Sequence, residues 1–375
     1  MSTKPIDVRT LVVKIGTALL TGPQGFDRAV LENIVKEMAQ LKRERNLNIV
    51  VVSSGAVGCG MAALGISEYP RLLPVKQAVA AVGQSRLMHH YEVLFQTHGN
   101  GLKTAQVLLT AAALEDRRTY LNVRNTILAL FQLGDVIPIV NENDSVATEE
   151  LRFGDNDGLA ARVASKIDAD LLIILSDVDG LYDRNPARDK NARLIPFVEN
   201  ITEDIEALAE DTITETTIGG MKTKLAAAQI ACAAGLRTIV ANGHRPNAVA
   251  NALDGAGPMT VFDSGQSALP HRKRWIAFGR ASRGALVVDD GAARALLEHG
   301  KSLLAAGITA LEGTFDVGAA VKIRDASGRD IARGLVNYSS KNISRIKGRK
   351  SAEIKEILGR KDFDEVIHRD NLVLL

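Results

Sequence analysis

Short apolar runs alternate with helical patterns along residues 11–261. The apolar runs are rich in Val, Ile and Leu and lack polar alternation, which is typical of parallel strands buried on both faces. Strands are predicted at residues 11–16, 104–109, 135–140, 168–175 and 237–242, and residues 48–58 are predicted as a strand running into a glycine loop. Apolar residues at helical spacing predict helices over residues 26–45, 71–97 and 117–132. This alternation predicts an α/β fold, a three-layer αβα sandwich with a mainly parallel sheet.

The pattern changes near residue 263. Residues 263–274 are polar, contain a proline and end in a basic cluster, which is typical of a linker or boundary loop. Beyond them the strands shorten, and residues 321–339 predict a hairpin with a Ser-Gly turn. We therefore predict a large α/β domain over residues 1–265, a linker over 266–282, and a small mixed β domain over 283–375.

Composition narrows the class of protein. The chain has 375 residues and is 46% hydrophobic and 24% charged, so it is neither largely disordered nor a coiled coil. Its 46 Lys and Arg residues nearly balance its 44 Asp and Glu residues, so no overall charge attracts nucleic acid or a membrane. Aromatic residues make up only 4%, which argues against a stacking platform for single-stranded nucleic acid. No apolar stretch approaches the roughly 18–20 residues of a membrane span.

The two cysteines indicate a reducing compartment. Cys59 and Cys232 lie far apart, and neither has a partner at CxxC spacing, which argues against zinc and against a redox pair. Both lie beside Ala or Gly, and cysteine is among the residues most often buried, so we expect both to be ordinary buried side chains. The polar N-terminus leads straight into a predicted strand, so we expect a cytoplasmic protein.

Lys14 lies inside the first apolar run, where a lysine is seldom buried without a partner. One alternative is an edge-strand lysine that reaches solvent. The other is a cation held at a strand end, where it neutralises phosphate. Open α/β sheets bind ligands at the carboxyl ends of their strands, which favours the second interpretation.

Two glycine-rich turns suit an anion. Residues 53–58, Ser-Ser-Gly-Ala-Val-Gly, join a strand to a helical pattern, and residues 217–224 place Gly-Gly before an Ala-rich helix with a lysine in its first turn. Backbone N–H groups in such turns can approach a phosphate. The alternative is an ordinary glycine turn with exposed lysines. Neither GxxxxGK(S/T) nor GxGxxG is present, which excludes the Walker and Rossmann fingerprints.

Acidic and amide residues gather after the strand at 135–140. Residues 141–144 are Asn-Glu-Asn-Asp and residues 154–158 are Gly-Asp-Asn-Asp-Gly, with a predicted hairpin between them. The alternative is a pair of Asx turns and a helix N-cap. The functional interpretation is a grip on an ammonium group and a metal–phosphate complex. Residues 176–180, Ser-Asp-Val-Asp-Gly, form a similar turn at the end of a predicted strand.

These features together indicate phosphoryl transfer. One edge of the sheet would carry two lysines, the glycine turns and the carboxylates. An acceptor that is already an anion needs no general base.

The motifs VVKIGT, VVSSGAVGCG, NENDSV, FGDNDGLAA, LSDVDGLY and GGMKTK together resemble the amino acid kinase family, in its glutamate-phosphorylating branch. The resemblance covers residues 10–262, and residues 284–357 resemble a PUA domain. It implies the transfer of phosphate from ATP to the γ-carboxylate of L-glutamate, which gives γ-glutamyl phosphate, the first step of proline synthesis.

The resemblance also implies roles for individual residues. The lysines would clamp the transferring phosphoryl group, and an aspartate would lie between them: the catalytic set is Lys14, Lys224 and Asp157. The glutamate site would comprise Ser54, Gly55, Asn141, Asp144, Asp155 and Asn156. The nucleotide site would comprise Lys14, Ser176, Asp177, Ile218, Gly219, Gly220, Met221, Lys222, Thr223 and Lys224. Mg²⁺ is expected with ATP as co-substrate, and no metal ligand is assigned to a protein side chain.

Two alternative functions stay open. One is an RNA-binding protein acting through the C-terminal tail, although residues 281–375 hold 16 Lys and Arg against 13 Asp and Glu and are only mildly basic. The other is a kinase for another small amino acid. For the leading function, the resemblance implies a homo-oligomer (dimer or tetramer), feedback inhibition by proline and a glutamyl phosphate reductase partner, with no membrane and no nucleic acid.

Overall fold

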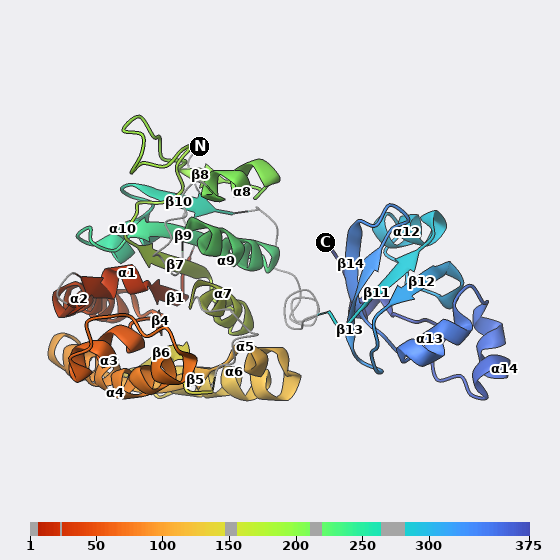
Figure 1. Cartoon of the computed structure of the whole chain (residues 1–375), viewed down its shortest axis with the longest axis horizontal. Coiled ribbons are helices and arrows are strands. Elements are labelled where there is room, and N and C mark those ends of the chain that lie inside the picture. Colours follow the sequence, from red (N-terminus) through yellow and green to blue (C-terminus); the bar gives the residue numbers. More distant parts are fainter. Residues whose placement is uncertain (1–6, 23–24, 147–155, 211–219, 264–281) are drawn as a thin grey trace. The chain divides into compact units, whose positions relative to one another are not determined.

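The chain forms two compact units, residues 1–268 and 269–375, which are described separately. The computed structural model describes residues 7–22, 25–146, 156–210, 220–263 and 282–375 (Figure 1). The predicted linker lies outside the described residues except for Ser282, and the hairpin predicted between residues 144 and 154 lies mostly outside them.

The first unit is built on an eight-stranded sheet in the order β5-β6-β4-β1-β7-β9-β10-β8. Neighbouring strands are parallel except for β9 and β10, which are antiparallel, so the predicted mainly parallel sheet is confirmed. The strands are β1 (Thr10–Ile15), β4 (Asn48–Ser53), β5 (Lys103–Leu109), β6 (Val136–Glu142), β7 (Leu171–Ser176), β8 (Phe197–Val198), β9 (Arg237–Asn242) and β10 (Met259–Phe262). A separate short hairpin joins β2 (Thr21–Gly22) to β3 (Gly25–Phe26).

Helices cover both faces of this sheet (Figure 1). One core packs against the face that carries Leu11 and Val13 of β1, and its helices are α1 (Thr17–Leu20), α2 (Arg28–Arg45), α3 (Ala56–Leu64), α4 (Leu73–His98) and α10 (Ala248–Asp254). The other core packs against the face that carries Val12, and its helices are α5 (Ala111–Glu115), α6 (Arg117–Gln132), α7 (Asn156–Lys166), α8 (Glu203–Glu210) and α9 (Met221–Ala233). Alternate residues of one strand therefore serve the two cores, as in a three-layer sandwich.

The predicted helices end where the sequence supplies caps. The side chain of Asp27 accepts hydrogen bonds from the first backbone N–H groups of α2, and Asn46 ends that helix in the left-handed conformation. A helix was expected after the glycine turn at residues 53–58, but its bounds were not predicted, because this segment has the composition of a loop; α3 lies partly within it. The helix begins at Ala56, directly after Gly55, whose φ is +103°.

The second unit contains a five-stranded sheet in the order β12-β11-β13-β14-β15. Its strands are β11 (Ala285–Val288), β12 (Ile308–Glu312), β13 (Ala320–Arg324), β14 (Asp330–Leu335) and β15 (Leu372–Leu374), and its helices are α12 (Asp290–Leu297), α13 (Ser340–Ile346) and α14 (Ile354–Leu358). Strands β13 and β14 form the predicted hairpin. This unit has its own hydrophobic core, which includes Phe315 and Tyr338.

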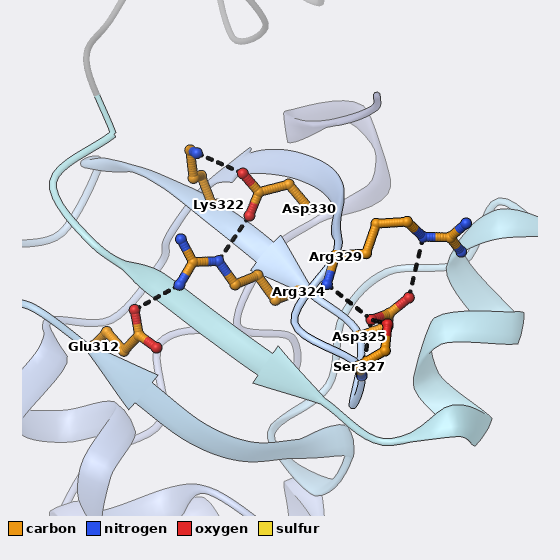
Figure 2. Close-up of polar contacts among 7 residues, drawn as sticks. All are labelled: Glu312, Lys322, Arg324, Asp325, Ser327, Arg329 and Asp330. Carbon is orange, nitrogen blue, oxygen red and sulfur yellow. Dashed lines mark hydrogen bonds and ion pairs between the residues drawn. The ribbon is translucent and has the colours of Figure 1, made fainter. Parts of the chain in front are cut away.

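An ion-pair network crosses one face of this second sheet (Figure 2). Arg324 of β13 donates to Asp330 of β14 at 2.7 Å and to Glu312 of β12 at 2.7 Å. Lys322 also pairs with Asp330. Each charge in the network thus meets one of opposite sign, which suits side chains that are partly exposed.

Candidate active site

The parallel strands bring the predicted site residues to one edge of the first sheet. In β1, residues 11, 13 and 15 face the α2 side, so Lys14 faces the α7 and α9 side with Val12. Strand β1 lies between β4 and β7 in the middle of the sheet, and Lys14 is only 3% exposed. The edge-strand interpretation of this lysine is therefore wrong.

Asp157 in the first turn of α7 lies between the two predicted catalytic lysines. Its Oδ1 is 2.5 Å from Lys14 Nζ, and its Oδ2 is 3.6 Å from Lys224 Nζ. The hydroxyl of Thr223 donates to the same Oδ2 at 3.0 Å. Asp157 is completely buried and Lys224 is 5% exposed. The three ionised groups carry a net charge of +1 in a desolvated setting, where a negative ligand is strongly attracted.

The buried residues Ser54 and Asn141 meet Asn156 at the start of α7. Asn156 Nδ2 lies 3.0 Å from three acceptors: the carbonyl of Ser53, the hydroxyl of Ser54 and Oδ1 of Asn141. Among the described residues, Asn156 Oδ1 is buried without a hydrogen-bond partner. A buried acceptor left in this state is unusual and marks a place where a ligand can complete the bonding.

The backbone conformation at position 55 requires glycine. Its φ of +103° is a conformation that other residues rarely adopt, and a Cβ there would lie 3.2 Å from Leu20 Cδ1. The turn lets the chain pass from β4 directly into α3. It thereby places Ser54 at the carboxyl end of β4 beside Asn156.

Two carboxylates lie at the end of β6. Burial, followed by the charge of Asp144, raises the pKa of Glu142 to about 7, and Lys76 of α4 opposes this. Burial also raises the pKa of Asp144, again opposed by Lys76. Raised pKa values mean that the ionised carboxylates lack full compensation, which an additional cation would supply.

The end of β7 carries the next predicted pair. Ser176 is buried, and its hydroxyl donates to Asp177 Oδ1 at 3.0 Å. Asp177 itself is exposed. The preceding residue, Leu175, accepts a hydrogen bond from Gly16 N at 3.2 Å, so the ends of β1 and β7 are fixed to each other.

Helix α9 supplies the remaining described part of the predicted nucleotide segment. Gly220 is its N-cap residue, and the backbone N–H of Thr223 donates to the Gly220 carbonyl oxygen, which also lies 2.8 Å from the Thr223 hydroxyl. Met221 is buried and Lys222 is exposed. Ile218, Gly219 and the predicted substrate residue Asp155 lie outside the described residues. An anion at this helix start would meet backbone N–H groups and the positive end of the helix dipole.

Sequence reasoning missed three residues near Asn141, Asp144 and Asn156. Gln84 of α4 accepts a hydrogen bond from Asn141 Nδ2 at 2.8 Å, and Lys76 of α4 acts on Glu142 and Asp144. Glu142 was noted only as a member of its motif. The signal for Lys76 and Gln84 was faint, since single polar residues on a long helix normally face solvent.

Within the described residues, no group of three or more His, Cys, Asp or Glu side chains is arranged to hold a metal ion. The described helices also include none that is both long and apolar enough to cross a membrane.

Comparison with known proteins gives two family matches. Residues 9–242 match the amino acid kinase family, and residues 284–358 match the PUA domain. The chain is 49% identical to glutamate 5-kinase of Moorella thermoacetica over 98% of this chain and 96% of the other. It is 47% identical to glutamate 5-kinase of Geobacter sulfurreducens over 98% of both chains. Among solved structures, an isopentenyl phosphate kinase aligns with 68% of this chain and all of its own, at 17% identity and a TM-score of 0.46. One family match falls in each compact unit.

Proposed function

The chain belongs to the amino acid kinase family, and we propose that it uses ATP to phosphorylate the γ-carboxylate of L-glutamate. The observation that carries this proposal is the buried carboxylate of Asp157 between the ammonium groups of Lys14 and Lys224. Its relatives at 45–49% identity over nearly the whole chain are glutamate 5-kinases, which supports the choice of acceptor.

Charge neutralisation is the main task in this reaction. A γ-carboxylate oxygen forms a bond to the γ-phosphorus of ATP while the bond from phosphorus to the bridging oxygen of ADP breaks. Negative charge spreads over the transferring group, and positioned ammonium groups stabilise it. Lys14 and Lys224 supply those groups, and Asp157 orients both. The acceptor is already an anion, so the site needs no general base.

The amino acid end of the site suits a zwitterion. The α-ammonium group would compensate Asp144, whose pKa is raised by burial. It can also donate to Asn156 Oδ1, which lacks a partner among the described residues. The hydroxyl of Ser54 and the N–H groups of the Gly55 turn suit the carboxylates.

Mg²⁺ is the ion we expect with ATP. It keeps several waters and binds mainly through substrate phosphates and one or two carboxylates. Both oxygens of Asp157 already lie within 3.6 Å of a lysine, so we assign phosphate oxygens and water as the ligands. This donor set fits an ion that arrives with the nucleotide. When bound, Mg²⁺ neutralises phosphate charge and holds the phosphate chain in place.

The direct test measures the product with a panel of acids. ADP should form when L-glutamate and Mg-ATP are supplied, and hydroxylamine should trap the acyl phosphate as a hydroxamate. Aspartate and N-acetylglutamate should be poor substrates. Equal turnover of either compound would contradict the assigned acceptor, while ADP release without hydroxamate would contradict an acyl phosphate product.

We also propose the surroundings of the reaction. An acyl phosphate is reactive, so a reductase that consumes it is the natural partner, and the product of that route, proline, would inhibit at the glutamate site. A cytoplasmic homo-oligomer is the expected form. Proline inhibition competitive with glutamate would support this placement.

A further inference from the structure

We propose that Gln84 is a positioning residue for the amino acid end of the site, where it fixes the carboxamide of Asn141 and, through it, that of Asn156. This inference rests on the proposed function, because it assigns Asn156 to the binding of the acceptor amino acid. Gln84 lies on α4, far in sequence from both asparagines.

Backbone groups fix the direction of the Asn156 and Asn141 amides. Asn156 Nδ2 donates to the carbonyl of Ser53, which can only accept. Asn141 Oδ1 accepts from the backbone N–H of Glu142 at 2.8 Å, which can only donate. The same Oδ1 also accepts from Asn156 Nδ2 at 3.0 Å.

These constraints leave one arrangement for Gln84. Asn141 Nδ2 must point away from the backbone of Glu142, and it donates to Gln84 Oε1 at 2.8 Å. Asn141 is 2% exposed, so water cannot easily replace this acceptor. Without Gln84, a buried donor would be left without this acceptor, and the amide would turn or shift to relieve it.

The position of α4 relative to α3 is also fixed, and with it the position of Gln84. A Cβ on the neighbouring Gly83 would lie 1.7 Å from the carbonyl oxygen of Ala56, and one on Gly60 would lie 1.9 Å from the carbonyl oxygen of Val79. Helices α3 and α4 therefore touch through their backbones, directly after the Ser54–Gly55 turn. Through this contact α4 is held against the start of α3, while Gln84 reaches the end of β6.

The consequence is a connection among four elements. Gln84 links α4 to Asn141 on β6, and Asn141 links to Asn156 on α7. Asn156 then faces Ser54 at the end of β4. A fault at Gln84 should thus disturb binding of the amino acid and leave the lysine pair, which Asp157 holds, in place.

The test is steady-state kinetics on Gln84→Leu and Gln84→Glu, with Gln96→Leu, an exposed residue of the same helix, as the matched control. Gln84→Leu removes the acceptor and should raise KM for glutamate about tenfold, with a much smaller change in kcat and in KM for ATP. Gln84→Glu keeps an acceptor for Asn141 Nδ2 and should recover much of the loss. Gln96→Leu should match the parent chain.

A double-mutant cycle separates positioning from general damage. If Gln84 acts through Asn141, Gln84→Leu should have little further effect in an Asn141→Ala background. Additive effects in that cycle, or an unchanged glutamate KM in Gln84→Leu, would overturn the proposal. If Gln84→Leu fails to fold, the glutamate KM of Gln84→Glu is compared with that of Asn141→Ala. The proposal requires that Gln84→Glu, which keeps the acceptor, also keeps a glutamate KM near that of the parent chain.

The parent chain distinguishes this failure from a failure of the proposed function. If it forms an acyl phosphate from a different acid, the acceptor assignment is wrong, and the same cycle is measured with that acid. If it turns over glutamate and the Gln84 variants bind it normally, only the role of Gln84 is wrong.

Discussion

Lys14 can be held inside a central strand because Asp157 supplies a carboxylate 2.5 Å away. We expect Lys14→Ala and Lys224→Ala each to lower kcat on the order of 10²–10³-fold, as does the loss of one preorganised charge donor. The KM for glutamate should move much less, because charge on the phosphoryl group develops in the transition state. Lys14→Arg should stay impaired, since a guanidinium is planar and cannot replace a compact ammonium.

Asp144→Ala provides the contrast in the same assay. It removes the proposed partner of the α-ammonium, which is remote from the reacting carboxylate, so glutamate KM should rise with a smaller loss of kcat. Steady-state kinetics on the three Ala variants, with circular dichroism to check folding, measures the split. A rise in KM alone for Lys14→Ala would refute the assigned roles, as would an unchanged KM for Asp144→Ala.

Individual residues could be predicted where a motif placed them at a strand end. Lys14 was conspicuous because it interrupts an apolar run, and Asn156 and Asp157 because they follow a buried strand. Gln84 and Lys76 were not, since only the tertiary packing of α4 brings them to the end of β6. One signal was present: Gly83 lies inside a long helix, where glycine costs about 1 kcal/mol relative to alanine, and such a position indicates a close backbone approach.

At the scale of elements, the strands were predictable because uninterrupted Val, Ile and Leu runs have few other uses. Strand β1 was expected at residues 11–16 and spans Thr10–Ile15. The bounds of helix α3 could not be predicted, because Gly55, Gly58 and Gly60 have the local preferences of a loop. Its helical state depends on packing against α4, where Gly60 allows the carbonyl of Val79 to approach.

The ion-pair network on β13 and β14 gives a prediction on stability. Asp330 is partly desolvated, which raises its pKa, yet hydrogen bonds from Lys322 and Arg324 outweigh this and lower the pKa overall. A carboxyl group whose pKa is lower in the folded state than in the unfolded state stabilises the folded state. This stabilisation is complete at pH values above the unfolded pKa of about 4, and it is lost as the pH falls through the folded pKa. Asp330→Asn should therefore destabilise the second unit at pH 7 by about 0.5–1 kcal/mol, and the difference should disappear in acid.

The loss of stability can be measured by hydrogen exchange of the backbone amides of β13 and β14 in the full chain. The quantity compared is the urea concentration at which half of their protection is lost. Glu356→Gln on α14 is the control, because Glu356 is exposed and has no ion pair within the described residues. An equal loss at pH 7 and at pH 3 would show that packing of Asp330, and not its charge, stabilises the hairpin.

At the scale of the whole molecule, the change of pattern near residue 263 is the basis of the predicted division into two domains. All the site residues assigned above belong to the first unit, and the buried cores of the two units share no residue. The sequence could not predict the strand order at the β8 end of the first sheet. Strand β10 runs antiparallel to β9 and parallel to β8, an order set by tertiary pairing and not by composition.

This pairing determines where the chain can be cut. A chain that ends at residue 270 keeps β10 between β9 and β8, so its sheet and both cores stay complete, and we expect it to form γ-glutamyl hydroxamate with nearly the parent kcat. A chain that ends at Pro258 lacks β10, which leaves β8 without its partner strand and exposes the buried side of β9; it should be unstable or insoluble. Circular dichroism and the hydroxamate assay on both chains provide the measurement. If the longer fragment folds but transfers no phosphate, the active site requires the PUA domain, and the assignment of all catalytic residues to the first unit is wrong.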